Sequence, residues 1–172
     1  FKQPTFSLTN GANVISTGTT TNWNNAICST LAATGGKFYW EAKWTAGDSY
    51  SIIGIIEAKE IHRCAASISG TGSDIYMHAN AIQTSNGGNP QRYRLVSSDD
   101  TIAHNIAVND ILGFALDTEN RKFFLSVNGT FVLSGNPATG ANPTWDTADI
   151  PANGEFVPYA QGYKISGATE FQ

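Results

Sequence analysis

The chain has 172 residues, of which 41% are hydrophobic and 11% aromatic, enough for one ordinary domain with a buried core. Only 14% are charged and the formal net charge is −4, so the composition typical of a disordered chain is absent. The 10 lysines and arginines are scattered, which argues against nucleic-acid binding, and no apolar run is long enough to predict a membrane-spanning segment.

Residue usage predicts an all-β fold. The sequence holds 15 isoleucines against 7 leucines, with many threonines and aromatic residues and a single methionine. β-branched and aromatic side chains fit the half-buried surface of a strand. Glycine and Asn-Gly pairs recur at intervals of roughly ten residues, which is the spacing of turns in a sandwich or barrel.

The first clear strand covers residues 37–45 and alternates between two faces. One face carries Phe38, Trp40, Ala42 and Trp44, and the other carries Lys37, Tyr39, Glu41 and Lys43. We expect the aromatic residues Phe38, Trp40 and Trp44 to fill the space between two sheets. Residues 50–57 are apolar on both faces and predict a central strand, in which Gly54 indicates the close approach of a neighbour.

The middle of the chain is less regular. Residues 74–78 and 91–96 read as short strands around a polar loop at 85–90. Residues 111–117 and 122–128 are then expected to pair with each other across a short polar turn.

The Asn128-Gly129 pair predicts a two-residue hairpin turn that returns the chain into a strand at 131–133. We prefer this interpretation to the glycosylation sequon that Asn128-Gly129-Thr130 also fits. A loop rich in Asn, Pro and Gly follows and contains Trp145, and the last strand is predicted from Phe156 to about Ile165.

Two cysteines, Cys28 and Cys64, are too few for a disulfide framework. They could form one bridge, but two buried small hydrophobic residues are the preferred interpretation. The sequence does not decide whether they meet.

The chain begins at Phe1 rather than at a methionine and stops shortly after Phe171, in what reads as the start of a strand. We therefore expect residues 1–172 to form a single domain that is a portion of a longer chain.

Five segments carry a resemblance to a known family: residues 36–43, 53–55, 109–117, 123–129 and 156–160. They read Gly-Lys-Phe-Tyr-Trp-Glu-Ala-Lys, Ile-Gly-Ile, Asn-Asp-Ile-Leu-Gly-Phe-Ala-Leu-Asp, Phe-Phe-Leu-Ser-Val-Asn-Gly and Phe-Val-Pro-Tyr-Ala. In order and spacing they are similar to the strands of SPRY domains, including a Leu-Asp-Tyr-Glu-like motif that reads Leu-Asp-Thr-Glu here. The pair Ala-Lys replaces the usual Val-Glu, and the N-terminal extension motif of PRY-SPRY proteins is not recognisable.

The resemblance implies a bent antiparallel β-sandwich of two sheets, a concanavalin-like jelly roll, with variable loops at one end that hold partners. It does not imply catalysis, and the residues agree. Glu57-Ala58-Lys59-Glu60, the nearest approach to a glycosidase acid pair, reads as a solvated turn. The three histidines are too far apart in sequence for a recognised zinc motif, and nucleophile-elbow and phosphate-loop motifs are missing. We expect no enzyme, no metal and no cofactor.

Binding through the loops is the better prospect, because aromatic and arginine side chains on a rigid sandwich offer stacking area and directed hydrogen bonds. The candidate partner-binding residues are Tyr50, Tyr76, Arg92, Tyr93, Arg94, Trp145 and Asp146. The alternative is that Tyr76, Tyr93 and Trp145 are packing anchors of their own loops. If Tyr93 and Trp145 bind a partner, replacing either with alanine weakens binding and leaves the melting temperature nearly unchanged.

Two functions remain open, and neither is enzymatic. The low charge and the Thr-, Asn-, Ser- and Gly-rich style resemble SPRY-like modules of bacteriophage fibre and head-decoration proteins. This favours a module of a virion surface protein that binds a host-surface glycan or protein, or a neighbouring virion protein, with a homo-oligomer possible in the assembly. The alternative is a cytoplasmic SPRY adaptor that recognises a short peptide.

Overall fold

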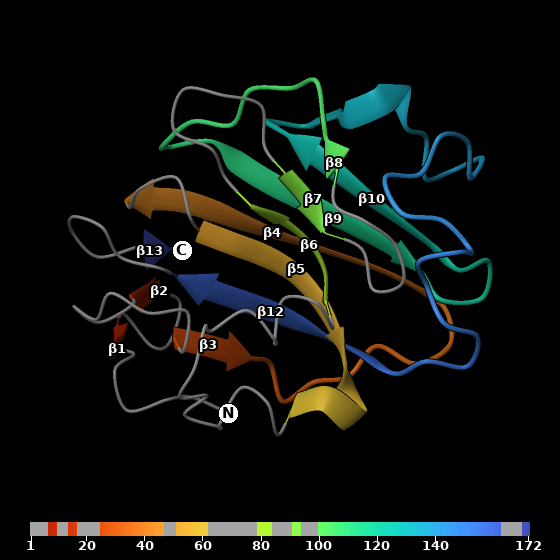
Figure 1. Cartoon of the computed structure of the whole chain (residues 1–172), viewed down its shortest axis with the longest axis horizontal. Coiled ribbons are helices and arrows are strands. Elements are labelled where there is room, and N and C mark those ends of the chain that lie inside the picture. The colour runs from red at the N-terminus through yellow and green to blue at the C-terminus, as the bar shows by residue number, and fades with distance from the viewer. Residues whose placement is uncertain are drawn as a thin grey trace.

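In the computed structural model, the residues that the structure describes are 7–9, 14–16, 25–46, 51–61, 79–83, 91–93, 100–162 and 170–172. They form a seven-stranded and a six-stranded sheet, and every neighbouring pair of strands is antiparallel (Figure 1). One hydrophobic core contains residues from both sheets. The all-β antiparallel sandwich predicted from the sequence is therefore confirmed.

The seven-stranded sheet has, in spatial order, β1 (Ser7–Thr9), β2 (Val14–Ser16), β13 (Glu170–Phe171), β4 (Lys37–Ala46), β9 (Ile111–Asp117), β10 (Lys122–Val127) and β11 (Thr130–Phe131). The six-stranded sheet has β3 (Asn25–Cys28), β12 (Phe156–Gly162), β5 (Ser51–Glu57), β6 (Ala79–Gln83), β7 (Gln91–Tyr93) and β8 (Asp100–Thr101). Two short 3-10 segments, η1 (Ala58–Glu60) and η3 (Val132–Ser134), follow β5 and β11.

The alternation along β4 places its aromatic residues as predicted. Trp44 is buried, and Phe38 and Trp40 are partly buried against the same core. The Trp40 ring stacks on Phe114 of β9 with 5.4 Å between ring centroids and on Phe123 of β10 with 5.7 Å. Offset aromatic stacking of this kind adds to the free energy gained by burying the rings.

The other strong strand predictions are also confirmed. β5 is buried along its whole length and lies between β12 and β6, as expected of a central strand. β9 and β10 pair directly, from Lys122 opposite Asp117 to Val127 opposite Leu112. At the turn after β10, Asn128 and Gly129 have φ of 50° and 80°, the left-handed conformations that a two-residue hairpin turn requires.

One prediction needs correction at its end, and two others lie partly or wholly outside the described residues. The strand expected at 131–133 stops at Phe131, because η3 begins at Val132 and Leu133 adopts a positive φ of 56°, which no strand accommodates. The strand expected at 91–96 is described only as β7, and the one expected at 74–78 lies outside the described residues, as does the loop at 85–90.

Cys28 overturns the preferred interpretation of the cysteines, since it is disulfide-bonded. It is 3% exposed at the end of β3 and packs with Ile52, Ile56 and Tyr159 in a second apolar cluster. Cys64, the other cysteine of the sequence, lies outside the described residues. Whether a cysteine is bridged depends on Cα atoms that approach to about 6 Å, which the tertiary fold decides and sequence spacing does not show.

Candidate functional site

The structure describes three of the seven predicted binding residues in full: Arg92, Trp145 and Asp146. Tyr50, Tyr76 and Arg94 lie outside the described residues. The backbone of Tyr93 belongs to β7, but its side chain also lies outside the description.

Trp145 is a core residue and not a surface one. Its side chain is fully buried, its ring lies 4.7 Å from that of Phe123, and its backbone exchanges two 2.9 Å hydrogen bonds with the same residue. The ring is therefore not available for stacking on a partner. The structure shows Trp145 as a packing anchor of its loop, the alternative that the sequence had left open.

Arg92 lies close to the same loop and restrains it. Its guanidinium donates a hydrogen bond to the carbonyl of Thr144, which joins β7 to the residue before Trp145. From the turn that joins β9 to β10 of the other sheet, Arg121 donates through Nε to the carbonyl of Ile150 at 2.7 Å and through Nη2 to that of Thr147. Two arginines thus hold the segment 144–150 from both sides of the sandwich.

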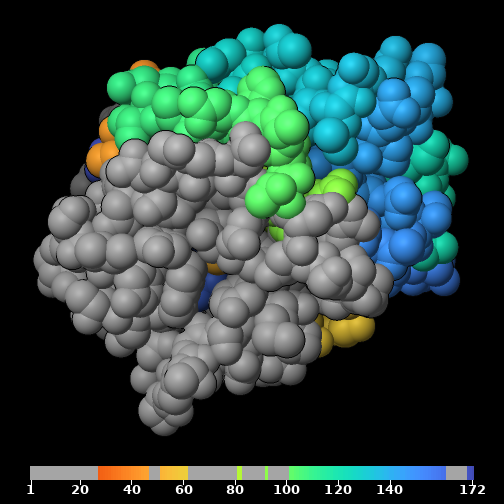
Figure 2. Space-filling model, turned by 45° about the horizontal axis from the view of Figure 1, so that its top comes forward, coloured from red at the N-terminus to blue at the C-terminus, as the bar shows by residue number. Residues whose placement is uncertain are grey.

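Asp146 remains exposed on this segment. Its Oδ1 accepts a 2.9 Å hydrogen bond from the Ala148 N–H, and its own N–H donates to Oδ2 of the buried Asp149 at 3.3 Å. The structure therefore places Arg92 of β7 against the restrained loop that carries Asp146. We call the residues Arg92, Thr144 and Asp146 the Arg92 rim. Residues 100–150, green to blue in Figure 2, form a continuous band of surface that includes this loop.

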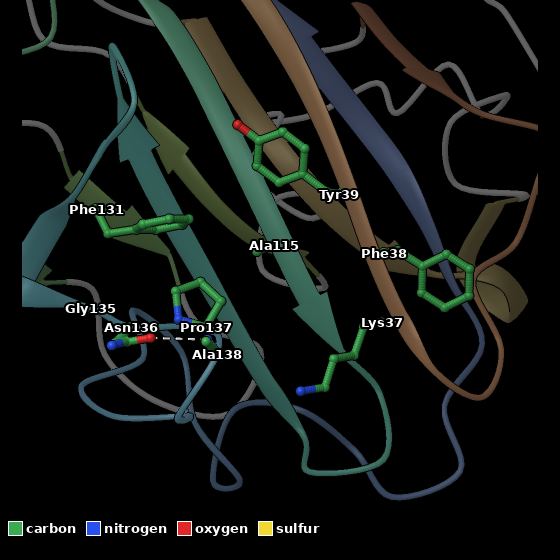
Figure 3. A pocket seen from close by; sticks show the side chains of 9 residues that line it. All are labelled: Lys37, Phe38, Tyr39, Ala115, Phe131, Gly135, Asn136, Pro137 and Ala138. Carbon is green, nitrogen blue, oxygen red and sulfur yellow. Dashed lines mark hydrogen bonds between the residues drawn. The ribbon is translucent and has the colours of Figure 1, made fainter.

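A second candidate site, which sequence reasoning missed, is a groove of about 700 Å³ on the outer face of the seven-stranded sheet. We call it the outer groove. It is lined by Lys37, Phe38, Tyr39, Ala115, Phe131, Gly135, Asn136, Pro137 and Ala138. Figure 3 shows the rings of Tyr39, Phe131 and Pro137 around the groove, whereas the Phe38 ring lies apart from them.

The strand pairing explains the floor and one wall of this groove. Tyr39 of β4 is opposite Ala115 of β9, and Ala115 is opposite Phe124 of β10, so all three belong to the outward face. The small Ala115 leaves a depression between two aromatic residues. Tyr39 is 55% exposed, whereas Phe124 is 1% exposed.

The opposite wall comes from β11 and the segment that follows it. Phe131 meets Phe124 edge-on with 6.2 Å between ring centroids, and a Cβ atom at Gly135 would lie only 3.2 Å from the Phe124 ring. The segment is turned by the positive φ angles of Leu133 and Ser134. Lys122 Nζ fastens its far end with a 2.6 Å hydrogen bond to the Gly140 carbonyl.

Charged groups mark the two ends of the groove. At one end Lys37 Nζ lies 3.5 Å from Asp117, with 61% of the lysine side chain exposed. Burial alone raises the pKa of Asp117, but hydrogen bonds from Asn120 and the ammonium of Lys37 outweigh it, so the pKa lies below its usual value.

At the other end Tyr39 donates a 2.7 Å hydrogen bond to Oε1 of Glu41. This bond, followed by partial burial and the charge of Glu41, raises the pKa of the Tyr39 hydroxyl, although a hydrogen bond with Ser126 acts in the opposite direction. The signal for the groove in the sequence was an aromatic residue on the polar face of an alternating strand.

The described residues supply no group of three or more His, Cys, Asp or Glu side chains that could hold a metal ion. No helix among them is long and apolar enough to cross a membrane. The Arg92 rim offers charged and hydrogen-bonding groups, and the outer groove adds exposed rings, a chemistry suited to holding a partner.

Comparison with known proteins shows the fold. No protein-family model matches the chain, and no curated protein sequence is significantly similar to it. Among solved structures, the SPRY domain of human HERC1 superposes with a TM-score of 0.66 at 14% identity, covering 97% of this chain and 90% of that one. The PSpry domain of TRIM65 superposes with a TM-score of 0.62 at 12% identity, covering 98% and 83%. The sandwich is therefore SPRY-like.

Proposed function

We propose that this chain is a non-enzymatic binding and assembly module of a virion surface protein, of the kind found in phage fibres or head decorations. The SPRY-like superposition over nearly the whole chain is the observation that carries a binding role. Because a fold hosts many functions, the role must rest on the sites, and both described sites suit binding. Its partner is a host-surface protein or glycan, or a neighbouring virion protein.

The disulfide at Cys28 supports a location outside a reducing cytosol. The low content of charged residues, 14%, agrees with a surface built from neutral polar groups. A cytoplasmic adaptor that recognises a short peptide has the same fold, but it would have to keep this bridge against glutathione and thioredoxin. We therefore place the module at a virion surface.

The Arg92 rim is the part of the loop surface that we assign to the partner. A loop fixed by hydrogen bonds loses little conformational entropy on binding, so an exposed carboxylate on it contributes more net affinity than one on a free loop. Asp146 offers that carboxylate, two residues after the Thr144 carbonyl that Arg92 holds. Arg92 acts as a positioning residue, since it holds the carbonyl of Thr144.

The decisive experiment is the mass of the native assembly from which the chain comes, measured by sedimentation or native mass spectrometry. Megadalton particles that carry many copies are expected. A monomer or a small complex would contradict the virion role and favour the adaptor. On the intact particle, Asp146→Lys should reduce attachment to host cells without changing particle mass, whereas the exposed control Glu119→Lys should change neither.

A further inference from the structure

We propose that the outer groove binds an extended, proline-containing peptide segment of a protein partner, with an acidic residue of that peptide beside Lys37. The groove belongs to the seven-stranded sheet, and the Arg92 rim is built on β7 of the six-stranded sheet. This site is therefore additional to the loop surface of the proposed function and does not depend on it.

The groove leaves apolar ring surface open in the middle of a sheet. Tyr39 is more than half exposed although its neighbours across the sheet, Ala115 and Phe124, are buried. β11 and the segment after it cover Phe124 but leave Tyr39 open, and Phe131 and Pro137 line the groove on their side (Figure 3). Two aromatic rings and the ring of Pro137 thus surround a small-residue floor, and aromatic-lined grooves are what hold polyproline-type peptides.

The hydrogen bonding around the groove argues for a ligand that needs few such bonds. β9 is paired on both sides, with β4 and with β10, so a peptide cannot add to the sheet at this point. Asn136 Oδ1 already accepts from the N–H groups of Ala138 and Thr139, at 3.0 and 3.2 Å. The Tyr39 hydroxyl donates to Glu41.

A polyproline II peptide suits such a surface. It has no internal hydrogen bonds, its backbone remains solvated, and it is preorganised, so it pays little entropy on docking. Its pyrrolidine rings pack on aromatic faces such as those of Tyr39 and Phe131. A sugar would require several free polar side chains directed into the groove, and the Asn136 side-chain oxygen and the Tyr39 hydroxyl already form hydrogen bonds within the protein.

The charges give the peptide a preferred sequence. On the outward face Asp117 is flanked by Lys37 and Lys122, so this end carries one more positive than negative charge. Lys37 has three donor hydrogens, and its 3.5 Å contact with Asp117 leaves donors free for a peptide carboxylate. Glu41 lies four residues along β4, at about 13 Å, and suits a basic residue about four polyproline residues away.

The test uses the whole chain and the peptide acetyl-Glu-Pro-Leu-Pro-Lys-amide, whose charged residues are four positions apart, titrated by calorimetry and by amide chemical shifts. Saturable binding that shifts the amides of Ala115 and Ala138 is expected. The peptide with alanine in place of each proline should bind at least tenfold more weakly. Tyr39→Ala should weaken binding by about tenfold and Lys37→Glu by about fivefold, the effects of losing one ring contact and one charge pair.

Matched controls separate the groove from general changes in charge and surface. Lys59→Glu makes the same change of charge in η1, away from the lining and from Glu41, and Leu31→Ala removes a remote exposed apolar side chain. Neither should change the affinity.

The proposal is overturned if the proline peptide does not bind saturably, if the alanine peptide binds equally well, or if an N-acetylglucosamine oligomer shifts the same amides instead. If Tyr39→Ala fails to fold, the Lys37→Glu result and the amide shifts of the unmodified chain still decide. Peptide binding is independent of particle mass and of Asp146, so failure here leaves the virion role standing, and the reverse also holds.

Discussion

At the scale of single residues, Asp117 ends β9 and stabilises the turn that follows. Its carboxylate accepts two 2.9 Å hydrogen bonds from Asn120 and faces Lys37. The pKa of Asp117 is lowered in the folded protein, so the folded state binds its proton less tightly than the unfolded chain does. The stabilisation is therefore complete at neutral pH and is lost as the pH falls below about 4.

We expect Asp117→Asn to reduce the free energy of unfolding by about 1–2 kcal/mol at pH 7. The difference from the unmodified chain should narrow at pH 3, where the native carboxylate begins to be protonated. Urea unfolding at both pH values measures this, with the exposed Glu119→Gln as a control that should have little effect. An equal loss at both pH values would show that the ionised form is not what stabilises the turn.

Gly113 is the second residue whose identity the structure explains. A Cβ atom there would lie 2.5 Å from the Tyr39 hydroxyl and would also collide with Ser126 Oγ. We expect Gly113→Ala to destabilise the fold by about 1–3 kcal/mol, the usual cost of overpacking. Removing one collision in Gly113→Ala/Ser126→Ala should recover part of this loss in the same unfolding assay. A stable single variant would mean that the sheet face has spare room at this position.

Residue-scale prediction from sequence succeeded where the surroundings are local. The alternation of β4 placed Trp40 and Trp44 correctly, because neighbouring positions of a strand face opposite sides. The role of Trp145 stayed open between binding and packing, because it follows no such alternation. Its burial depends on contacts with Phe123 and on the hydrogen bond from Arg92 to Thr144, which are distant in the sequence.

At the scale of elements, the segment 144–150 connects the two sheets, through a hydrogen bond to Arg92 of β7 and the packing of Trp145 on Phe123 of β10. Trp145 is its apolar anchor, and Leu125 N–H donates at 2.9 Å to the buried Thr144 hydroxyl. We expect Trp145→Ala to lower the free energy of unfolding by about 3–5 kcal/mol, the cost of emptying a large core site. Thermal unfolding measures this, and Trp145→Phe should cost less. An unchanged melting temperature would return Trp145 to the list of surface binding residues.

Long or regular elements were predictable, and short ones were not. β4, β5, β9 and β10 have six to ten residues each, enough for periodicity to appear. β1, β2 and β3 have three or four residues, too few to show a pattern. Neither candidate site could be derived in this way, because the outer groove joins β4 to a segment about a hundred residues later, and the Arg92 rim joins β7 to a loop about fifty residues later.

At the scale of the whole molecule, the sandwich follows from composition and strand order, but the sheet order does not. β9 and β10 are neighbours in sequence and in space, whereas β13 lies between β2 and β4, and β12 between β3 and β5. Such pairings join distant parts of the chain, so they are determined by the total fit of the core and not by any local motif.

The disulfide of Cys28 adds a covalent tie to this non-local topology, and it connects stability with the proposed setting. A cross-link stabilises mainly by restricting the unfolded chain, so we expect reduction to lower the free energy of unfolding by about 2–4 kcal/mol. Urea unfolding with and without a phosphine reductant measures the loss, and intact mass confirms the redox state.

The double variant Cys28→Ser/Cys64→Ser controls for other effects of the reductant, because its unfolding curve should not respond to it. A bridge that is absent from the unreduced protein, or a midpoint unchanged by reduction, would contradict the prediction. A reduced chain as stable as the oxidised one would fold equally well in a cytosol, and the main structural argument for a virion surface would fall. A large loss would mean that the module is suited to the oxidising exterior, where a particle meets its host.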